Sequence, residues 1–375
     1  MSTLNVVHAG ARLPPLTLEE ARRLQFRLIE TLRRHFSGQE WLTRGELGVG
    51  SDGEGSPFTR RVEQVLAAFF GSEAAVLVTG AGTGAIRAAL FALLPPLSRI
   101  VVHDAPLYAT TAVTFRAAGY VAVPVDLHDL ERLRQVLSRE EVQAIYVQHT
   151  RQRPADHYDL AAVIACVRGV RPELPIIVDD NYAVANTPRI GVELGADVSA
   201  FSAYKLLGPE GIGVVLCPRR LAQAIRADMY SGGSRVQGFQ AQEVVIGLAQ
   251  AFVANALTQE SAEAVVERLR SAPPPACARH IDGAFLANLQ SPVVLVRLRQ
   301  PLAERVVARA AERGAAPFPV GAMARYELTP LFYRVSGTMS ASLGAGEAQH
   351  WLRINPMRAG PETVLAILEE ALSEV

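Results

Sequence analysis

The chain has 375 residues, of which 49% are hydrophobic and 20% are charged, and its formal net charge at pH 7 is zero. This length allows two domains with cores of their own. The balanced charge, with no dominant block of Lys and Arg, argues against nucleic acid or an anionic membrane as the main partner. Every long apolar run is interrupted by Gly, Pro or a charged residue, which argues against a membrane-spanning helix.

The cysteines and the first residues indicate the cellular compartment. Cys166, Cys217 and Cys277 are far apart and lack the spacing of metal ligands. Free thiols of this kind are typical of a reducing compartment, and the N-terminal residues do not resemble a secretory signal, so we expect a cytoplasmic protein without a metal. We expect Cys166 in a helix, Cys217 in a strand and Cys277 in a loop.

The predicted elements begin with an amphipathic helix over residues 16–36, a Gly-rich segment over 45–56 and a second helix over 57–70. From residue 74 onward, strands alternate with helices. The predicted strands are 75–79, 99–103, 121–125, 144–148, 176–178, 198–201 and 212–217, and the helices are 83–94, 109–118, 127–138 and 160–168. This alternation is typical of an α/β fold with a mostly parallel sheet covered by helices.

A helix over 243–256 is predicted to link this region to a smaller α/β domain. The sequence SAPPPAC at 271–277 marks a junction, because prolines end regular structure. A strand over 293–298 and helices over 302–313 and 362–372 follow it. We therefore divide the chain into an N-terminal arm (1–56), a large domain (57–256) and a small domain (257–375).

Charged side chains follow two neighbouring predicted strands. Asp179 and Asp180 come after strand 176–178, and Lys205 comes after strand 198–201. Ligands of open α/β sheets bind at the carboxyl ends of the strands. A lysine and a carboxylate placed there suit pyridoxal 5'-phosphate (PLP), because the lysine forms a Schiff base and the acid keeps the pyridine nitrogen protonated. Taken alone, either residue also fits an ordinary surface loop.

The segment TGAGTGA at 79–85 joins a strand to the start of a helix. Its glycines expose backbone amides, the helix dipole attracts an anion, and Thr83 adds a hydroxyl group. The spacing is neither that of a dinucleotide fingerprint nor that of a P-loop. We interpret it as a phosphate cup around Gly82 and Thr83, with a tight strand–helix turn as the alternative.

Two more predicted strands are followed by side chains that could contact a cofactor ring. Tyr108 follows strand 99–103 and would stack on a flat ring, unless it is a partly buried turn residue. His149 and Gln152 follow strand 144–148 and would reach a ring oxygen, unless they belong to a surface loop.

The order of these features resembles the fold-type-I PLP-dependent enzymes, the aspartate aminotransferase superfamily. Asp179 and Lys205 are separated by 205 − 179 = 26 residues, and the family shows an interval of a few tens. LLGPEGIG and YSGGSRVQG are similar to the class V aminotransferases and selenocysteine synthases, and RRVEQVLAAFFGSEAAVLVTGAGTGAI is similar to the cystathionine synthase/lyase branch. The whole chain most resembles a bacterial aminotransferase-like branch. The resemblance implies a three-layer αβα sandwich and a smaller C-terminal α/β domain.

The resemblance also implies roles for individual residues. Lys205 bonds to the cofactor and then moves a proton at the substrate α-carbon. Asp179 pairs with the pyridine nitrogen, with Asp180 as the alternative if the alignment slips by one residue. The other implied positions are Gly82, Thr83 and Ser202 at the phosphate, Tyr108 stacked on the ring with a catalytic role, Gln152 or its competitor His149 near the ring hydroxyl, and Arg353 or Arg334 on the substrate α-carboxylate.

The simplest expected activity is transamination of an amino acid by a homodimer with active sites at the interface. Ser231–Arg235 would reach the phosphate of the neighbouring subunit. A PLP-dependent lyase of the C–S or β/γ-elimination type, or a racemase, would use the same lysine and acid. A non-catalytic PLP-fold binding protein is the alternative from another class. GELGVGSDGEGSPFTRR lacks the Tyr-x-Arg of the cystathionine branch, and no cysteine is well placed for a desulfurase.

Overall fold

The computed structural model describes residues 13–43, 55–150, 152–153, 156–287, 292–321, 323–335, 340, 343 and 345–375. Most of the Gly-rich segment predicted over 45–56 lies outside these residues. The chain forms two compact units. The larger comprises Glu19–Thr150 and Tyr158–Phe252, and the smaller comprises Met1–Leu18, Arg151–His157 and Val253–Val375. The division predicted at residues 56 and 256 stays a prediction.

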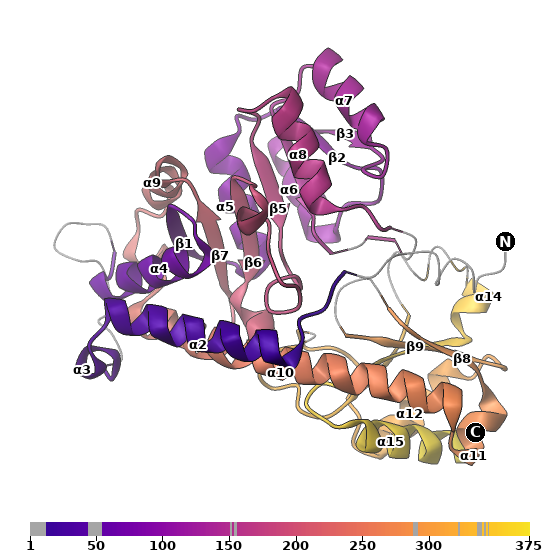
Figure 1. Ribbon diagram of the computed structural model, residues 1–375. Coiled ribbons are helices and arrows are strands. Elements are labelled where there is room, and N and C mark those ends of the chain that lie inside the picture. Colours follow the sequence, from indigo (N-terminus) through magenta and orange to yellow (C-terminus); the bar gives the residue numbers. More distant parts are fainter. Residues whose placement is uncertain are drawn as a thin grey trace. The chain divides into compact units, whose positions relative to one another are not determined.

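A seven-stranded sheet forms the centre of the larger unit (Figure 1). Its strand order is β1-β7-β6-β5-β4-β2-β3. The pairs of β7 with β1 and with β6 are antiparallel, and the remaining pairs are parallel. The strands are β1 Ala74–Thr79, β2 Arg99–His103, β3 Val121–Val125, β4 Ala144–Gln148, β5 Ile176–Asp179, β6 Val198–Ser202 and β7 Ile212–Cys217. This mixed, mostly parallel sheet confirms the predicted fold class.

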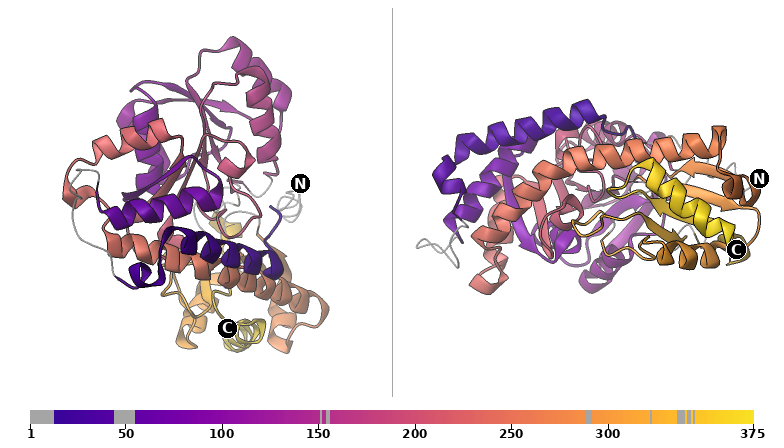
Figure 2. Two further views of the ribbon diagram at one scale, coloured as in Figure 1. Left: turned by 60° about the vertical axis from the view of Figure 1, so that its left-hand side comes forward. Right: turned by 90° about the horizontal axis from the view of Figure 1, so that it is seen from below.

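Helices cover both faces of this sheet, as Figure 2 shows. Side chains alternate along each strand, so Val102 and Tyr146 pack on one face while Val101 and Ile145 pack on the other. Strands β4 to β7 are buried at every position, as a doubly covered sheet requires. The first face carries α5 (Ala81–Leu93), α6 (Ala109–Ala118) and α9 (Arg219–Asp228), and the second carries α4 (Pro57–Phe70), α7 (Leu130–Arg139) and α8 (Leu160–Val170).

The element boundaries deviate from prediction for local reasons. Helix α7 begins at Leu130 and not at 127, because the Asp129 side chain caps it by accepting a hydrogen bond from the Arg132 amide. Strands β5 and β6 are each one residue longer than predicted, so Asp179 and Ser202 are the last residues of their strands. The N-terminal helices are α2 (Leu18–His35) and α3 (Gly38–Trp41), and short 3-10 turns are η1 (Val192–Leu194), η2 (Ala203–Leu206) and η3 (Gly232–Ser234).

Helix α10 (Gly238–Ser271) is far longer than the helix predicted over 243–256. Beyond residue 256, the buried Thr258 hydroxyl donates to the backbone oxygens of Ala254 and Met357. The helix therefore continues, and its last turns contribute Val265 and Leu269 to the core of the smaller unit.

The smaller unit contains a four-stranded antiparallel sheet of order β10-β11-β9-β8. Its elements are α11 (Pro275–His280), β8 (Ile281–Leu286), β9 (Val294–Leu298), α12 (Ala303–Glu312), β10 (Leu331–Arg334), α14 (Ala345–Ala348), β11 (Trp351–Asn355) and α15 (Pro361–Ser373). Strands β8, β10 and β11 were not predicted. One face of the sheet packs on helices, and Phe332, Leu352 and Ile354 point into that core.

Cys277 is a correction, because it lies in helix α11 and not in a loop. The prolines start this helix, and the Glu369 carboxylate accepts hydrogen bonds from the amides of Ala276 and Cys277. All three cysteines are buried, and burial raises the pKa of both Cys217 and Cys277 to about 12. Over the described residues, no helix is both long and apolar enough to cross a membrane.

Candidate active site

The predicted lysine and acid lie at one edge of the large sheet. Asp179 is the last residue of β5, and Lys205 lies in η2, directly after β6. Because β5 and β6 are parallel neighbours, their carboxyl ends open at the same edge. Strand β1 also ends there, since Thr79 pairs with Ile212 and Ser202 pairs with Gly213 on opposite sides of β7.

Asp179 is buried, and both of its carboxylate oxygens accept hydrogen bonds. The Tyr146 hydroxyl donates to Oδ2 at 2.9 Å. The backbone N and the side-chain Nδ2 of Asn181 donate to Oδ1 at 3.0 and 2.7 Å. Burial raises the pKa of Asp179, and the hydrogen bonds from Asn181 and the charge of Lys205 oppose that rise.

Asp180 is engaged elsewhere. It is fully buried, and its Oδ1 accepts a hydrogen bond from Nδ1 of the buried His149 at 2.6 Å. Its Oδ2 accepts from the Gly191 amide at 3.0 Å. Asp180 thus holds the segment after β5 in place, and this arrangement favours Asp179 as the acid that would face a cofactor.

Lys205 carries an unusually acidic ammonium group. Burial lowers its pKa to about 8, while the charge of Asp179 acts in the opposite direction. The Nζ atom lies 3.9 Å from the centre of the Tyr182 ring. Tyr182 has a positive φ of 64°, which is rare for a bulky side chain and is found where a site holds the backbone under strain.

The turn from β1 to α5 forms a tight backbone cradle. Gly80 caps α5 with φ 94°, and the amides of Gly80 and Ala81 both donate to Gly211 O. A Cβ atom on Gly84 would lie 2.0 Å from Thr79 O, and one on Gly213 would lie 2.2 Å from Ala81 O. Only glycine allows this approach, which aims the amino end of α5 at the same edge as Lys205.

The residues expected at the phosphate belong to this region. Gly82 and Thr83 are in the first turn of α5, and the Thr83 hydroxyl donates to Thr110 Oγ1 at 2.9 Å. Ser202 is buried at the end of β6, and its amide donates to Asn181 Oδ1 at 3.1 Å.

Tyr108, the residue expected to stack on the cofactor ring, is the N-cap of α6 and is 49% exposed, so its ring has a free surface.

The residues expected at the ring hydroxyl and at the substrate carboxylate, Gln152 and Arg353, belong to the smaller unit. The backbone N–H of Gln152 donates to Asp156 Oδ2 at 3.2 Å. Arg353, on β11, sits 4.8 Å from the centre of the Tyr333 ring, and its buried Nε has no hydrogen-bond partner within the part of the chain that is described. A buried Nε without a partner can donate to a carboxylate, which is consistent with the expected role of Arg353.

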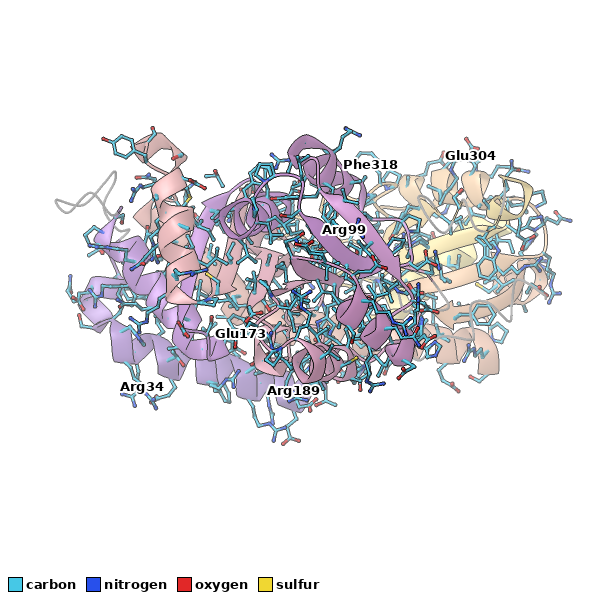
Figure 3. All side chains as sticks on the ribbon, turned by 90° about the horizontal axis from the view of Figure 1, so that it is seen from above. Arg34, Arg99, Glu173, Arg189, Glu304 and Phe318 are labelled. Carbon is cyan, nitrogen blue, oxygen red and sulfur yellow. The ribbon has the colours of Figure 1, made fainter. Side chains whose placement is uncertain are left out.

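Arg334 is a weaker candidate than Arg353. It is exposed and forms an ion pair with Glu304 at 3.2 Å, and the Glu304 side chain is 84% exposed at the periphery (Figure 3). Exposed pairs of this kind contribute little to stability or specificity. The segment Ser231–Arg235 is held within its own chain, since Arg235 Nε donates to Met229 O at 2.7 Å.

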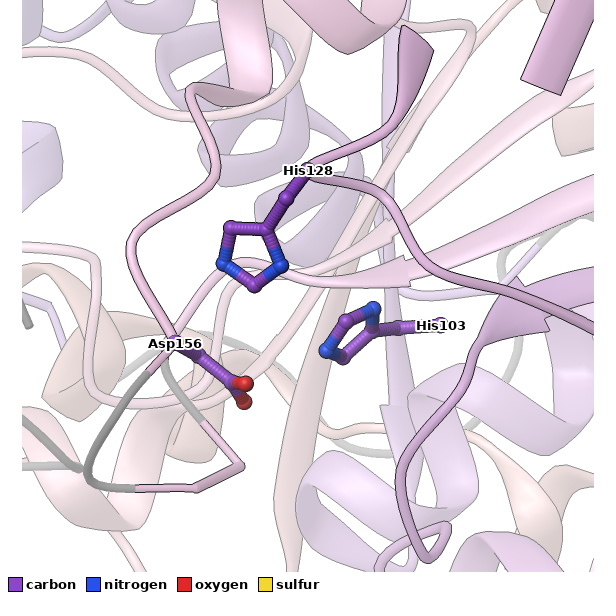
Figure 4. Close-up of side chains that lie close together, drawn as sticks. All are labelled: His103, His128 and Asp156. Carbon is purple, nitrogen blue, oxygen red and sulfur yellow. The ribbon is translucent and has the colours of Figure 1, made fainter. Parts of the chain in front are cut away.

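His103, the last residue of β2, and His128, which follows β3, lie close together (Figure 4). The His103 and His128 ring centres are 5.5 Å apart, and both rings contact Tyr158. The Leu127 amide donates to His103 Nδ1 at 3.2 Å, which fixes the proton of a neutral ring on Nε2. A nitrogen that carries a proton is not a metal ligand, so the hydrogen bond favours a packing role for His103.

Sequence reasoning missed Tyr146, Asn181 and Tyr182 as parts of the site. Tyr146 could have been found, because a tyrosine in a buried strand needs a partner for its hydroxyl and Tyr146 shares a sheet face with Asp179. The contacts of Asn181 and Tyr182 depend on the path of the loop after β5. No periodic pattern encodes that path.

These side chains fit PLP. They comprise a buried lysine with a lowered pKa, a buried carboxylate on a neighbouring strand, and a glycine cradle at a helix start that would accept a phosphate. With the sheet topology, they define a fold-type-I PLP-dependent enzyme. The chain belongs to the Cys/Met metabolism PLP-dependent enzyme family, whose model matches residues 53–280, and residues 263–368 match the model of the YhfS-like C-terminal domain.

Individual similar proteins support the assignment to this family. The uncharacterized protein YhfS of Escherichia coli (strain K12) is 47% identical over 97% of this chain and 99% of its own length. The crystal structure of the pyridoxal-5'-phosphate dependent protein YhfS from Escherichia coli superposes with a TM-score of 0.94, covering 98% of this chain and 99% of that one at 46% identity. Apo CalE6, a methionine gamma lyase from Micromonospora echinospora, has a TM-score of 0.70 at 19% identity and covers 93% of this chain and 98% of that one, so it supports the fold.

Proposed function

We propose that this protein is a PLP-dependent lyase that eliminates a sulfur leaving group from the β- or γ-carbon of a small amino acid. The observation that carries the proposal is the match of residues 53–280, more than half of the chain, to the Cys/Met metabolism family. The likeness to a methionine gamma lyase adds support for elimination over transamination. We had expected an aminotransferase as the simplest activity, and the family match favours the lyase alternative.

The proposed roles follow from the contacts. PLP, when bound, supplies an electron sink for the bond broken at the substrate α-carbon. Lys205 Nζ, with a pKa near 8, accepts and returns the α-proton. Asp179 holds the proton of the pyridine nitrogen, Tyr108 stacks on the ring and the α5 cradle binds phosphate. Arg353, whose buried Nε has no hydrogen-bond partner among the described residues, binds the substrate carboxylate.

In the proposed reaction the C–S bond breaks and the sulfur leaves as a thiol with one proton. Water then converts the remaining carbon skeleton to a 2-oxo acid and ammonia. Transamination would use the same lysine and acid, but it would leave the amino group on the cofactor. The two reactions therefore differ in where the nitrogen goes, and this difference supplies the test.

The experiment is to incubate the PLP-loaded protein with methionine, cystathionine, homocysteine and cysteine in turn. We expect a thiol (or hydrogen sulfide, from cysteine and homocysteine), 2-oxo acid and ammonia in equal amounts from at least one of them, with no pyridoxamine phosphate. Pyridoxamine phosphate with a matching 2-oxo acid and no ammonia would instead establish transamination. No product from any amino acid, with PLP still bound, would favour a binding protein.

Two isosteric variants test which acid serves the cofactor. Asp179→Asn removes the charge beside Lys205, so we expect turnover to fall by at least about a hundredfold, equivalent to about 3 kcal/mol. Asp180→Asn disturbs the His149 contact but leaves that charge in place, so the loss should be much smaller. If Asp180→Asn loses activity while Asp179→Asn stays active, then Asp180 and not Asp179 pairs with the pyridine nitrogen.

A further inference from the structure

Asn181 connects three parts of the candidate site through one side chain. Its Nδ2 donates to Asp179 Oδ1 at 2.7 Å, and its Oδ1 accepts from the Ser202 amide at 3.1 Å. A Cβ atom on Gly82 would lie 2.4 Å from Asn181 Oδ1 and 2.6 Å from Nδ2. The amide group therefore touches the end of β5, the end of β6 and the first turn of α5.

The Asn181 amide satisfies both polar contacts at once. A carboxylate can only accept hydrogen bonds and a backbone amide can only donate, so the side chain between Asp179 and Ser202 must offer one donor and one acceptor. Aspartate at position 181 would accept from Ser202 but would place a second oxygen beside the Asp179 carboxylate. Two carboxylates that close cannot both stay ionised.

We infer that Asn181 is a positioning residue, which keeps Asp179 ionised and oriented and fixes the spacing between that acid and the phosphate cradle. This inference rests on the proposed role of Asp179. The contact with Tyr146 holds Oδ2, and the two contacts from Asn181 hold Oδ1, so the carboxylate plane is set by three hydrogen bonds. Gly82 is small because the Asn181 amide occupies the space of a side chain there.

The main test is Asn181→Asp, which preserves shape, the Ser202 contact and the backbone donor to Asp179, but removes the side-chain donor to Asp179. We expect the Kd for PLP to rise about ten- to hundredfold, as for a lost hydrogen bond to a charged group. The pH dependence of the visible absorption of the lysine-bound cofactor should shift as well, which a purely structural defect would not cause. The melting temperature of the cofactor-free protein serves as the check on folding.

Asn186→Asp is the matched control. It makes the same substitution five positions along the same loop, where the Asn186 Nδ2 donates to Tyr182 O at 3.0 Å and not to Asp179. Its PLP affinity and absorption titration should stay within about twofold of wild type. Equal effects of the two substitutions would overturn the inference, because they would indicate a general response of the loop to added charge.

A double-mutant cycle tests the contact between Asn181 and Gly82. Gly82→Ala should weaken PLP binding by displacing the amide, and the double variant Gly82→Ala/Asn181→Ala should be no worse than Asn181→Ala alone. Strictly additive losses would contradict the contact. If Asn181→Asp does not fold, the double-mutant cycle still tests the inference, since Asn181→Ala adds no charge.

Asp179→Asn separates failure of this inference from failure of the proposed function. If Asp179→Asn is impaired while Asn181→Asp matches wild type, only the positioning role is wrong. If Asp179→Asn itself binds PLP and titrates like wild type, the acid has been misassigned and the proposed site fails.

Discussion

Lys205 shows how burial sets the chemistry of one residue. Its pKa near 8 lies below that of an ordinary lysine, because burial disfavours the charged form more strongly than Asp179 favours it. At neutral pH a larger fraction of the amine is therefore neutral, and the neutral amine is the form that attacks an aldehyde. Function and not stability benefits from this lowered pKa.

We predict that covalent capture of PLP by the cofactor-free protein speeds up as the pH rises to about 8 and then levels off. Stopped-flow absorbance over a pH series would measure it. Lys205→Arg, which remains charged, should capture no PLP. A rate that keeps increasing to about pH 10 would mean that the lysine is not buried as described.

The two acids show what a residue pattern leaves open. The two acids are adjacent in sequence, so the family resemblance favoured Asp179 but left Asp180 as the alternative after a slip of one residue. The structure distinguishes them by their partners, Tyr146 and Asn181 for Asp179 and His149 for Asp180. Those partners come from other strands and from a loop.

At the scale of elements, the turn between β1 and α5 is the most constrained part of the site. We predict that Gly84→Ala lowers the free energy of unfolding by about 1–3 kcal/mol, since its Cβ would overlap Thr79 O. It should also weaken PLP binding by displacing the amino end of α5. Chemical denaturation and a PLP titration would measure the two effects.

Gly169→Ala, within α8, is the control for that prediction. Nothing lies within 4 Å of its new Cβ, so alanine should be neutral or stabilising by about 0.5–1 kcal/mol. Equal effects at positions 84 and 169 would show that the loss of glycine itself, and not the overlap with Thr79, causes the change.

At the scale of the whole molecule, we predict a homodimer. The family resemblance implies active sites at a two-fold interface, and helix α2 exposes two large apolar side chains, with Phe26 66% and Ile29 46% accessible. Light scattering should give twice the chain mass, and Phe26→Asp with Ile29→Asp should reduce it if α2 lies in the interface. A monomer that holds PLP and turns over substrate would contradict the prediction.

The sequence alone determined the fold class, the cofactor and most strands of the large sheet, because these depend on hydrophobic period and on residues at strand ends. It also placed Lys205 and Asp179 correctly at one sheet edge, since parallel strands bring their carboxyl ends together. It did not find β8, β10 and β11, whose stability depends on pairing with each other and on the helices behind them.

Only the tertiary structure decided which side chains surround the acid and the lysine. Tyr146 reaches Asp179 from strand β4. Asn181 and Tyr182 reach the acid and the lysine from the loop after β5, where Tyr182 has a positive φ, and no local pattern specifies that path. The lowered pKa of Lys205 is likewise a property of burial by residues distant in sequence. Strand period follows from local spacing, whereas the environment of a buried charge depends on the packed fold.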